Sequence, residues 1–377
     1  MRGHLEQRGR GSWGVRVDLP PGPNGRRRQQ RVTIRGTRKD AEKRLAELLH
    51  QQDQGLPIDN SKLVLGDYLV TWLRDVVAVR TRPRTLDSYQ NTIKGHVLPV
   101  LGGIPLQKLQ AADVDRLIAS LKDKGLSTTT CLRVFRILSK ALKDAMKRGL
   151  VFRNVCQAVE PPHPGRYEVE APEMDTTLRV LALAKGSPYH SLFTLLAYTG
   201  LRRGEALALR WANVDMERGV ASIVESLQRL PSKGLEVQPT KSAAGRRGIA
   251  LDPGTVNLLR EHQGRQLLIK TALEGGYQDR GLVFTSPLGG YLDPQLVTKA
   301  WERLRDRAGY PHLRLHDLRH GHAAGLIKAG VHPKVVQDRL GHANAAFTMQ
   351  VYGHVAAGLQ EEAVVRFANL MAQEKVR

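Results

Sequence analysis

Alternating apolar and polar residues at the start of the chain predict a small sheet covered by one helix. Residues 11–19 and 31–35 alternate with a period of two, and a turn-forming cluster at 20–25 separates them. The positions expected to face inward are Trp13, Val15, Val17, Leu19, Val32 and Ile34. A capping sequence at Thr37–Asp40 opens a predicted helix whose apolar stripe is Ala41, Leu45, Leu48 and Leu49. We therefore expect residues 1–58 to form a small ββ(β)α domain.

Helical periodicity of apolar residues marks the next part of the chain. It recurs near residues 65–76, 86–97, 114–121 and 127–142. Pro99 and Gly102 are expected to end the second helix, and Gly125 the third. This pattern predicts an all-α four-helix domain over residues 63–160. The proline-rich sequence that follows predicts a linker over residues 161–171.

The remaining residues, 172–377, combine helical and strand-like patterns. Helices predominate, and a strand region is expected near residues 220–251. A final helical stretch at 359–373 carries apolar residues at Val364, Phe367, Leu370 and Met371. We expect a mixed α+β, mainly helical domain with a C-terminal tail.

The composition is that of a globular protein, since 41% of the 377 residues are hydrophobic. No apolar run approaches the ~20 residues of a membrane span, and no apolar secretory segment begins the chain. We therefore expect a cytoplasmic protein without a membrane partner. Cys131 and Cys156 form no Cys-x-x-Cys pair, which argues against a disulfide or a thiolate zinc site.

Positive charge is spread over the whole chain. The net charge is +22, and dividing the chain at residues 62 and 160 gives +7, +8 and +7, which sum to that total. A long polyanion such as DNA is the partner that this distribution favours, and dispersed surface charge is the plain alternative. The candidate DNA-binding residues are Arg16, Arg31, Thr33 and Arg35 on the strands and Arg84, Arg133 and Lys140 on the helices.

Four short segments of the last domain carry the candidate chemistry. Residues 199–205 read Thr-Gly-Leu-Arg-Arg-Gly-Glu after an apolar helix, and residues 240–247 read Thr-Lys-Ser-Ala-Ala-Gly-Arg-Arg between two strand-like runs. Residues 316–320 read His-Asp-Leu-Arg-His. Leu-Gly-His follows at 340–342, and Tyr-Gly-His at 352–354. Each motif is weak alone, but the set in this order is specific.

In this order the segments resemble the tyrosine recombinase, or phage integrase, family, and the two upstream domains are similar to those of the larger, lambda-like integrases. The resemblance implies a site-specific DNA recombinase that cleaves and rejoins DNA through a 3′-phosphotyrosine intermediate and a Holliday junction. Its task would be the integration or excision of a phage or another mobile element. Residues 1–58 would bind arm-type DNA sites, and residues 63–160 would clamp core-type sites. A homotetramer on DNA is implied, with each tail docked on a neighbouring protomer rather than packed on its own chain.

The resemblance assigns the catalytic roles to Arg202, Lys241, His316, Arg319, His342 and Tyr352. Guanidinium forks at Arg202 and Arg319 match the non-bridging phosphate oxygens. Tyr352 would be the nucleophile and His316 its proton acceptor. Lys241 would protonate the leaving 5′-oxygen, and His342 would donate a hydrogen bond to the phosphate. Because the phosphotyrosine keeps the energy of the broken ester, we expect no cofactor, neither ATP nor a metal ion.

Several of these residues have a competitor in the sequence. Arg203 competes with Arg202, and Lys233, in the preceding turn, competes with Lys241. The spacing of His316 and His320 also suits zinc, although no zinc signature surrounds them. In the second layer of the site, Glu205 is expected to pair with nearby arginines, and His320 to support the site.

Two other functions remain open at this point. A type IB topoisomerase-like enzyme shares this chemistry, but the arm-like domain argues against it. A catalytically silent DNA-binding regulator is disfavoured by the complete catalytic set. For a recombinase, an excisionase or a DNA-bending host protein would be a further partner, and the protein would be associated with the nucleoid.

Overall fold

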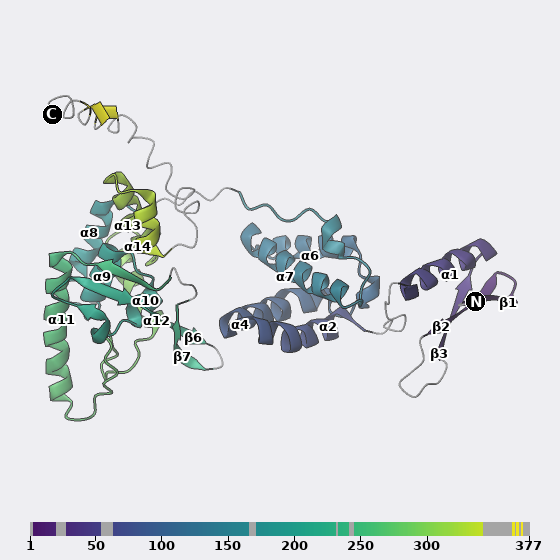
Figure 1. Ribbon diagram of the computed structural model, residues 1–377, viewed down its shortest axis with the longest axis horizontal. Helices are drawn as coiled ribbons and strands as arrows, with labels where there is room; N and C mark the ends of the chain where they lie inside the picture. The colour runs from purple at the N-terminus through teal and green to yellow at the C-terminus, as the bar shows by residue number, and fades with distance from the viewer. Residues whose placement is uncertain are drawn as a thin grey trace. The chain divides into compact units, whose positions relative to one another are not determined.

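The computed structural model of the chain describes residues 3–19, 28–53, 63–165, 171–230, 233–240 and 245–341, together with residues 364, 365, 367, 368 and 371 of the tail. The chain forms two compact units, Met1–Arg166 and Tyr167–Arg377 (Figure 1). The first unit contains two separate apolar cores, and the second contains a large core and a small one. The predicted fold class is confirmed: a small sheet with a helix, an all-α part and a mainly helical mixed part.

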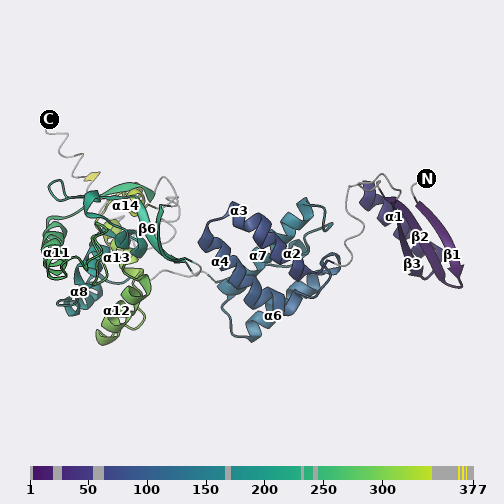
Figure 2. The same ribbon diagram turned by 90° about the horizontal axis from the view of Figure 1, so that it is seen from below.

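A three-stranded antiparallel sheet forms the start of the first unit. Its strands are β1 (Gly3–Gly9), β2 (Ser12–Leu19) and β3 (Arg28–Arg35), in this order across the sheet. α1 (Arg38–Asp53) packs against β1 and β2 on one face (Figure 2). Val15, Val17, Ala41 and Leu48 are buried between the helix and the sheet. The predicted inward face is therefore confirmed for these residues.

β1 and the helix cap show how far the local pattern predicts this sheet. The alternation defines two strands and leaves a third optional, because Leu5 is the one apolar residue of β1. In the sheet, Leu5 lies opposite Val15, so β1 extends the apolar face. The capping sequence is confirmed: the Thr37 N–H donates to Asp40 Oδ2 at 2.8 Å, and the Asp40 N–H donates to Thr37 Oγ1 at 3.3 Å.

The rest of the first unit is helical. Its helices are α2 (Leu65–Trp72), α3 (Ala78–Arg80), α4 (Pro83–Thr92), α5 (Leu98–Leu101), α6 (Ala111–Asp123) and α7 (Thr128–Lys147), with 3₁₀ turns at Leu106–Lys108 and Val155–Ala158. π-helical turns at Leu73–Val77 and Ile93–Val97 join α2 to α3 and α4 to α5. The result is the four predicted rods.

The prediction that Pro99 ends the second rod is wrong, because the helix continues to Leu101. The Leu98 N–H donates to the carbonyl oxygen of Ile93, five residues back, within the π-helical turn. A proline lacks the N–H that an α-helix requires, and the wider turn just before it removes the need for that hydrogen bond. The rod ends one residue before Gly102, as predicted.

The core of the helical part is apolar, and polar groups at its edge or within it form hydrogen bonds. Ser127 caps α7 as predicted, since its Oγ accepts from the Thr130 N–H at 3.3 Å. The buried Tyr68 hydroxyl donates to the Ala141 carbonyl oxygen at 2.6 Å. Cys131 and Cys156 are both buried and free, which agrees with the expectation of no disulfide.

The second unit is mainly helical with two small sheets. Its helices are α8 (Met174–Leu183), α9 (His190–Thr199), α10 (Arg203–Leu207), α11 (Pro253–Ala272), α12 (Pro294–Arg307), α13 (Asp317–Lys328) and α14 (Pro333–Leu340), with a 3₁₀ turn at Trp211–Asn213. Its strands are β4 (Val214–Asp215), β5 (Val220–Ile223), β6 (Glu225–Leu230), β7 (Gly234–Pro239) and β8 (Arg247–Ala250). One antiparallel sheet has the order β4-β5-β8, and β6 and β7 form a hairpin. The strand region predicted near residues 220–251 is thereby confirmed.

The core of the second unit ties α9 to α12. The rings of Phe193 and Trp301 meet edge to face, with centroids 5.1 Å apart, and both side chains are fully buried. Of the predicted tail, the described residues are helical, and Val364, Phe367 and Met371 are exposed. No helix in the described ranges is both long and apolar enough to cross a membrane.

Candidate active site

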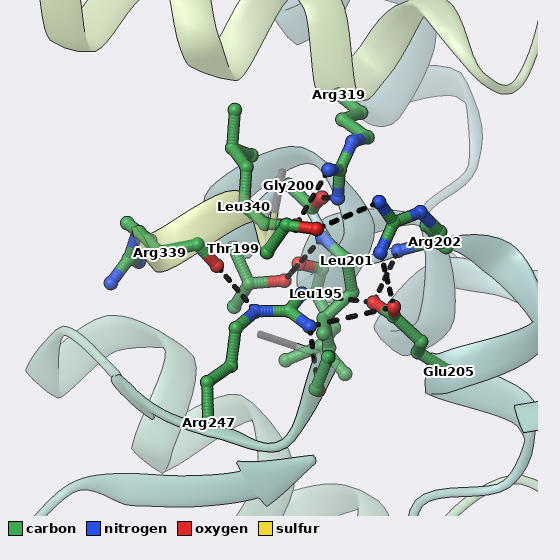
Figure 3. Close-up of polar contacts among 12 residues, drawn as sticks. Leu195, Thr199, Gly200, Leu201, Arg202, Glu205, Arg247, Arg319, Arg339 and Leu340 are labelled. Atoms are coloured by element: carbon green, nitrogen blue, oxygen red, sulfur yellow. Dashed lines mark hydrogen bonds and ion pairs between the residues drawn. The ribbon is translucent and has the colours of Figure 1, made fainter. Parts of the chain in front are cut away.

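Three arginine side chains converge on the C-terminal end of α14 (Figure 3). Each donates to a different carbonyl oxygen of consecutive residues. The pairs are Arg247 Nε with Arg339 O at 2.6 Å, Arg319 Nη2 with Leu340 O at 2.6 Å, and Arg202 Nη2 with Gly341 O at 3.1 Å. Carbonyls at a helix C-terminus lack donors within the helix and lie at the negative end of its dipole. The arginines therefore bind the acceptors that the helix leaves open.

Gly200 creates the bend that brings two of these arginines together. α9 ends there in a left-handed conformation, with φ of +66°. Its carbonyl oxygen accepts from Arg319 Nη1 at 2.7 Å, and Arg202 follows two residues later. A Cβ at Gly200 would lie 2.7 Å from both His322 Cδ2 and Leu340 Cδ2. Glycine is thus required both for the backbone conformation and for the close packing.

Glu205 holds Arg202 in place from the interior. Its Oε1 accepts from Arg202 Nη1 at 2.7 Å, and its Oε2 accepts from the Arg202 backbone N–H at 3.0 Å. Arg247 Nη2 donates to the same Oε2 at 2.9 Å. Burial alone would raise the pKa of Glu205, but the hydrogen bond from Arg247 and the charges of both arginines outweigh it and lower that pKa. Glu205 therefore stays ionised, and it holds one edge of the Arg202 guanidinium.

Two histidines flank Arg319. His316 directly precedes α13, His320 lies one turn further, and their ring centroids are 5.0 Å apart. Solvent still reaches His316, but partial burial, His320 and Arg319 together lower the pKa of His316. Burial also lowers the pKa of His320. Both rings are therefore neutral at pH 7, and a neutral imidazole near a phosphate can accept a proton.

The same two histidines were the candidates for zinc. In the described part of the chain, no group of three or more His, Cys, Asp or Glu side chains is arranged to hold a metal ion. A structural zinc site needs four ligands, and a catalytic one needs three. The described residues therefore offer this pair no zinc site.

The competitor arginine points elsewhere. Arg203 Nη1 donates to the carbonyl oxygen of Pro294 at 3.0 Å and to Thr298 Oγ1 on α12. Arg202 instead shares Glu205 with Arg247, and it shares the end of α14 with both Arg247 and Arg319. Arg203 therefore lies outside the arginine cluster, and Arg202 lies within it.

Half of the predicted catalytic set lies outside the described residues: Lys241, His342 and Tyr352. The described chain reaches Thr240 before Lys241 and resumes at Gly245, and it reaches Gly341 before His342. Gly245 and Gly341 accept hydrogen bonds from the arginine cluster, and Thr240 lies against Gly245. The described neighbours of these residues therefore lie at the cluster. The competitor Lys233 is exposed at the turn between β6 and β7.

The predicted DNA-binding residues of the first sheet share its open face. Arg16 lies directly opposite Arg31, and Thr33 and Arg35 follow on the same side, away from α1. Arg31, Thr33 and Arg35 are exposed. Arg16 is half-buried and forms an ion pair with Glu6 at 2.5 Å, so part of its charge is already matched.

The predicted residues of the helical part lie on two neighbouring rods. Arg84 is exposed on α4. From α7, Arg133 donates to Ser88 Oγ, and Lys140 lies 5.2 Å from the centre of the Tyr89 ring. These two exposed cations of α7 therefore reach across to α4.

Sequence reasoning missed Arg247 and the contact between Arg339 and His322. Arg339 Nε donates to His322 Nε2 at 3.0 Å. Burial and the Arg339 charge lower the pKa of His322 to about 4, which keeps the ring able to accept. The sequence places an arginine pair after Gly245, but nothing local shows which member turns inward.

The chain is strongly basic, and its second unit holds a cluster of arginines beside the predicted catalytic segments. Residues 172–358 match the model of the phage integrase family, and residues 64–122 match the N-terminal SAM-like domain of phage integrases. An integrase of Streptomyces ambofaciens is 30% identical over 351 residues, covering 90% of this chain and 88% of that protein. A tyrosine recombinase XerC-like protein of Caldanaerobacter subterraneus subsp. tengcongensis is 28% identical, covering 87% and 88%.

Two solved structures show a similar fold. The Tn1549 transposon integrase in complex with a circular intermediate DNA has a TM-score of 0.69 at 18% identity and covers 81% of this chain and 99% of that chain. The lambda integrase tetramer bound to a Holliday junction has a TM-score of 0.57 at 18% identity and covers 91% and 94%. The chain belongs to the phage integrase family and is a tyrosine recombinase.

Proposed function

We propose that this recombinase integrates a mobile DNA element by cleaving and rejoining DNA through a covalent bond to Tyr352. The observation that carries the proposal is the convergence of Arg202 and Arg319 on the end of α14, directly before the segment that contains His342 and Tyr352. Relatives named integrase, among them a putative prophage phiRv2 integrase of Mycobacterium tuberculosis, support integration as the outcome.

In the proposed reaction, the phenol oxygen of Tyr352 attacks the phosphorus of the scissile phosphate. The bond from phosphorus to the 5′-oxygen breaks, and a 3′-phosphotyrosine forms. His316 accepts the phenol proton, because its lowered pKa keeps the ring neutral at pH 7. Lys241 gives a proton to the 5′-oxygen. Attack by the 5′-hydroxyl of another strand reverses these steps and joins the strands.

Arg202 and Arg319 stabilise the charge on the non-bridging oxygens, and His342 adds a hydrogen bond to them. Bound DNA would replace neutral carbonyl acceptors of the arginines by phosphate oxygens. Hydrogen bonds between ionised partners are roughly twice as strong as neutral ones, which favours the exchange. The Arg202 side chain is 41% exposed, so a phosphate can reach it.

Double-stranded DNA with core-type and arm-type sites is the proposed partner, and four protomers would act together. The lambda integrase tetramer on a Holliday junction supports this assembly. Within it, the exposed Val364 and Phe367 of the tail would dock on a neighbouring protomer. We also propose an excisionase or a DNA-bending host protein as an accessory partner, and an association with the nucleoid.

The test is Tyr352→Phe in the full chain, with the reaction run in excess chelator. The variant should form no covalent DNA adduct but bind the site within a few-fold of wild type, because one hydroxyl is lost. Wild type should form adducts despite the chelator, since arginines supply the charge that a metal would otherwise supply. Denaturing gels and gel-shift titrations on the same DNA measure both.

Tyr198→Phe is the matched control, because it removes one phenolic hydroxyl from a tyrosine that is 44% exposed on α9. It should leave adduct formation unchanged. An adduct formed by the Tyr352 variant would disprove the nucleophile. Inhibition by the chelator that zinc reverses would revive a metal role for His316 and His320. Strand exchange between two sites separates recombination from topoisomerase-like relaxation.

A further inference from the structure

The Arg247 side chain is held by hydrogen bonds within the protein. Its guanidinium makes four hydrogen bonds: one to the Arg339 carbonyl oxygen, one to the Gly245 carbonyl oxygen at 3.1 Å, and two to Glu205 at 2.9 and 3.4 Å. A guanidinium has five N–H donors, so nearly all are used. The side chain is 7% exposed. Arg319 is buried as well, but Arg247 is ion-paired with the buried Glu205, so its charge is already matched within the protein.

Two acceptors of Arg247 lie next to the segments that carry the predicted catalytic residues Lys241 and Tyr352. They are the carbonyl oxygens of Gly245 and Arg339. Gly245 follows residues 241–244, and a Cβ added to it would lie 2.7 Å from Thr240 Cβ. The two residues that flank the Lys241 segment are thus in close contact. Thr240 is itself anchored, because its N–H donates to the Val224 carbonyl oxygen at 3.1 Å. The hydrogen bond from Arg247 to the Gly245 carbonyl oxygen holds this pair of flanking residues from the protein interior.

The other acceptor lies at the end of α14, from which the segment with His342 and Tyr352 departs. The tie between β8 and α14 runs in both directions, since Arg339 Nη1 donates to the Ala250 carbonyl oxygen of β8 at 3.0 Å. The guanidinium of Arg247 donates from three nitrogens to four oxygens of three residues, whereas a lysine ammonium has three donors on a single nitrogen and cannot replace this set. Glu205 then links this tie to Arg202.

We propose that Arg247 is a positioning residue of strand transfer. Without touching DNA, it fixes the positions of Thr240 and Gly245, which flank the Lys241 segment, and of the end of α14. These positions are fixed relative to the Arg202–Glu205 pair. The inference rests on the proposed function, because it assigns Lys241 and Tyr352 to the reaction. It predicts that loss of Arg247 slows the chemical step while DNA binding remains.

The experiment compares Arg247→Met and Arg247→Lys in the full chain with Arg218→Met. Arg218 lies in the same small sheet's β4–β5 turn and is 84% exposed, so its variant loses the same charge without a buried partner. Three quantities are measured: affinity for a core site, the rate of adduct formation at saturating protein, and hydrogen exchange by peptide.

For Arg247→Met we expect an affinity within about threefold of wild type and a cleavage rate lower by on the order of 10²-fold, the typical cost of a small misplacement. Exchange should quicken in peptides 240–250 and 336–345 but not in α12. Arg247→Lys should have a cleavage rate between those of wild type and Arg247→Met, and Arg218→Met should match wild type.

Cleavage at the wild-type rate would overturn the proposal. So would a loss of affinity with an unchanged rate at saturation, which would make Arg247 a DNA contact. Faster exchange throughout the second unit in both variants would reduce Arg247 to a general stabiliser. If the methionine variant does not fold, the lysine variant decides by the same criteria. Absence of adducts with wild type would instead contradict the proposed function.

Discussion

At the scale of single residues, the cluster shows how one carboxylate organises two cations. Glu205 is 4% exposed, and its two oxygens serve Arg202 and Arg247. Isolated burial of any of these charges would be costly, but each compensates another. The Arg202 side chain is 41% exposed, whereas that of Arg247 is 7% exposed. The two arginines thus share one carboxylate but differ in how much of each side chain solvent can reach.

Lys241 is the residue for which a chemical test is sharpest. A 5′-bridging sulfur leaves without a proton, because a thiolate is far less basic than an alkoxide. Lys241→Ala should therefore lose on the order of 10²–10⁴-fold in cleavage of ordinary DNA and recover most of it on 5′-phosphorothiolate DNA. Single-turnover adduct formation on the two substrates measures this rescue.

Arg202→Ala is the comparison for that experiment. It should show no rescue, because the charge on the non-bridging oxygens is present with either leaving group. Equal defects of Lys241→Ala on both substrates would mean that Lys241 only positions DNA. Lys233→Ala, at the exposed turn between β6 and β7, would then be tested as the alternative acid.

At the scale of elements, the site depends on how helices end. α9 ends in a left-handed glycine, which turns the chain so that α10 begins at Arg203. α14 also ends in a left-handed glycine, Gly341, with φ of +65°. The open carbonyls at these two helix ends are the acceptors of Arg319 and Arg202. Helix termini, rather than helix faces, therefore build the arginine cluster.

Gly200→Ala tests the packing of the first of these ends. The alanine must adopt a left-handed φ, and its methyl group must displace His322 or Leu340. We expect a loss of about 1 kcal/mol from the backbone and roughly 1–3 kcal/mol more from overpacking. Cleavage should fall more than DNA binding, because the acceptor of Arg319 moves. Denaturant unfolding and adduct assays measure the two effects.

Gly186→Ala is the matched control for that variant. Gly186 has φ of +82°, but a Cβ there meets no atom within 4 Å. It should therefore show the backbone cost alone, with normal cleavage. Equal losses of stability in both variants would argue against the packing role of Gly200.

At the scale of the whole molecule, the chain is built from parts with their own apolar cores. The β1–β3 sheet with α1 has an apolar core that is separate from that of the helical rods. Its open face carries Arg31 and Arg35. This arrangement suits a module that binds DNA apart from the site of cleavage.

Deletion of residues 1–58 should spare binding and cleavage at a core site but abolish binding to a separate, more distant site. The physical reason is that the deleted core is self-contained. Footprinting with both sites on one DNA measures the division. Loss of protection at the core site would contradict the domain boundaries. Arg31→Ala/Arg35→Ala should repeat the distant-site defect, whereas Lys39→Ala/Lys43→Ala on exposed α1 positions should not.

The sequence by itself determined the main elements, because periodicity and caps are local. Alternation around Val15 and Val32 predicted the sheet, and helical repeats predicted the four rods. The order of the motifs predicted the family. The sequence pattern did not predict β1 with certainty, because that strand depends on pairing with β2. It also did not predict that the helix continues past Pro99, because this depends on the π-helical turn just before the proline.

Only the tertiary structure decided which arginines belong to the site and how. Arg247 is 42 residues from Glu205 and 92 residues from Arg339, and its rotamer follows from where packing places those acceptors. Arg203 turns to α12 for the same reason, although its local sequence is as basic as that of Arg202. A side chain's partners across such separations are set by the fold, and no periodicity in the sequence encodes them.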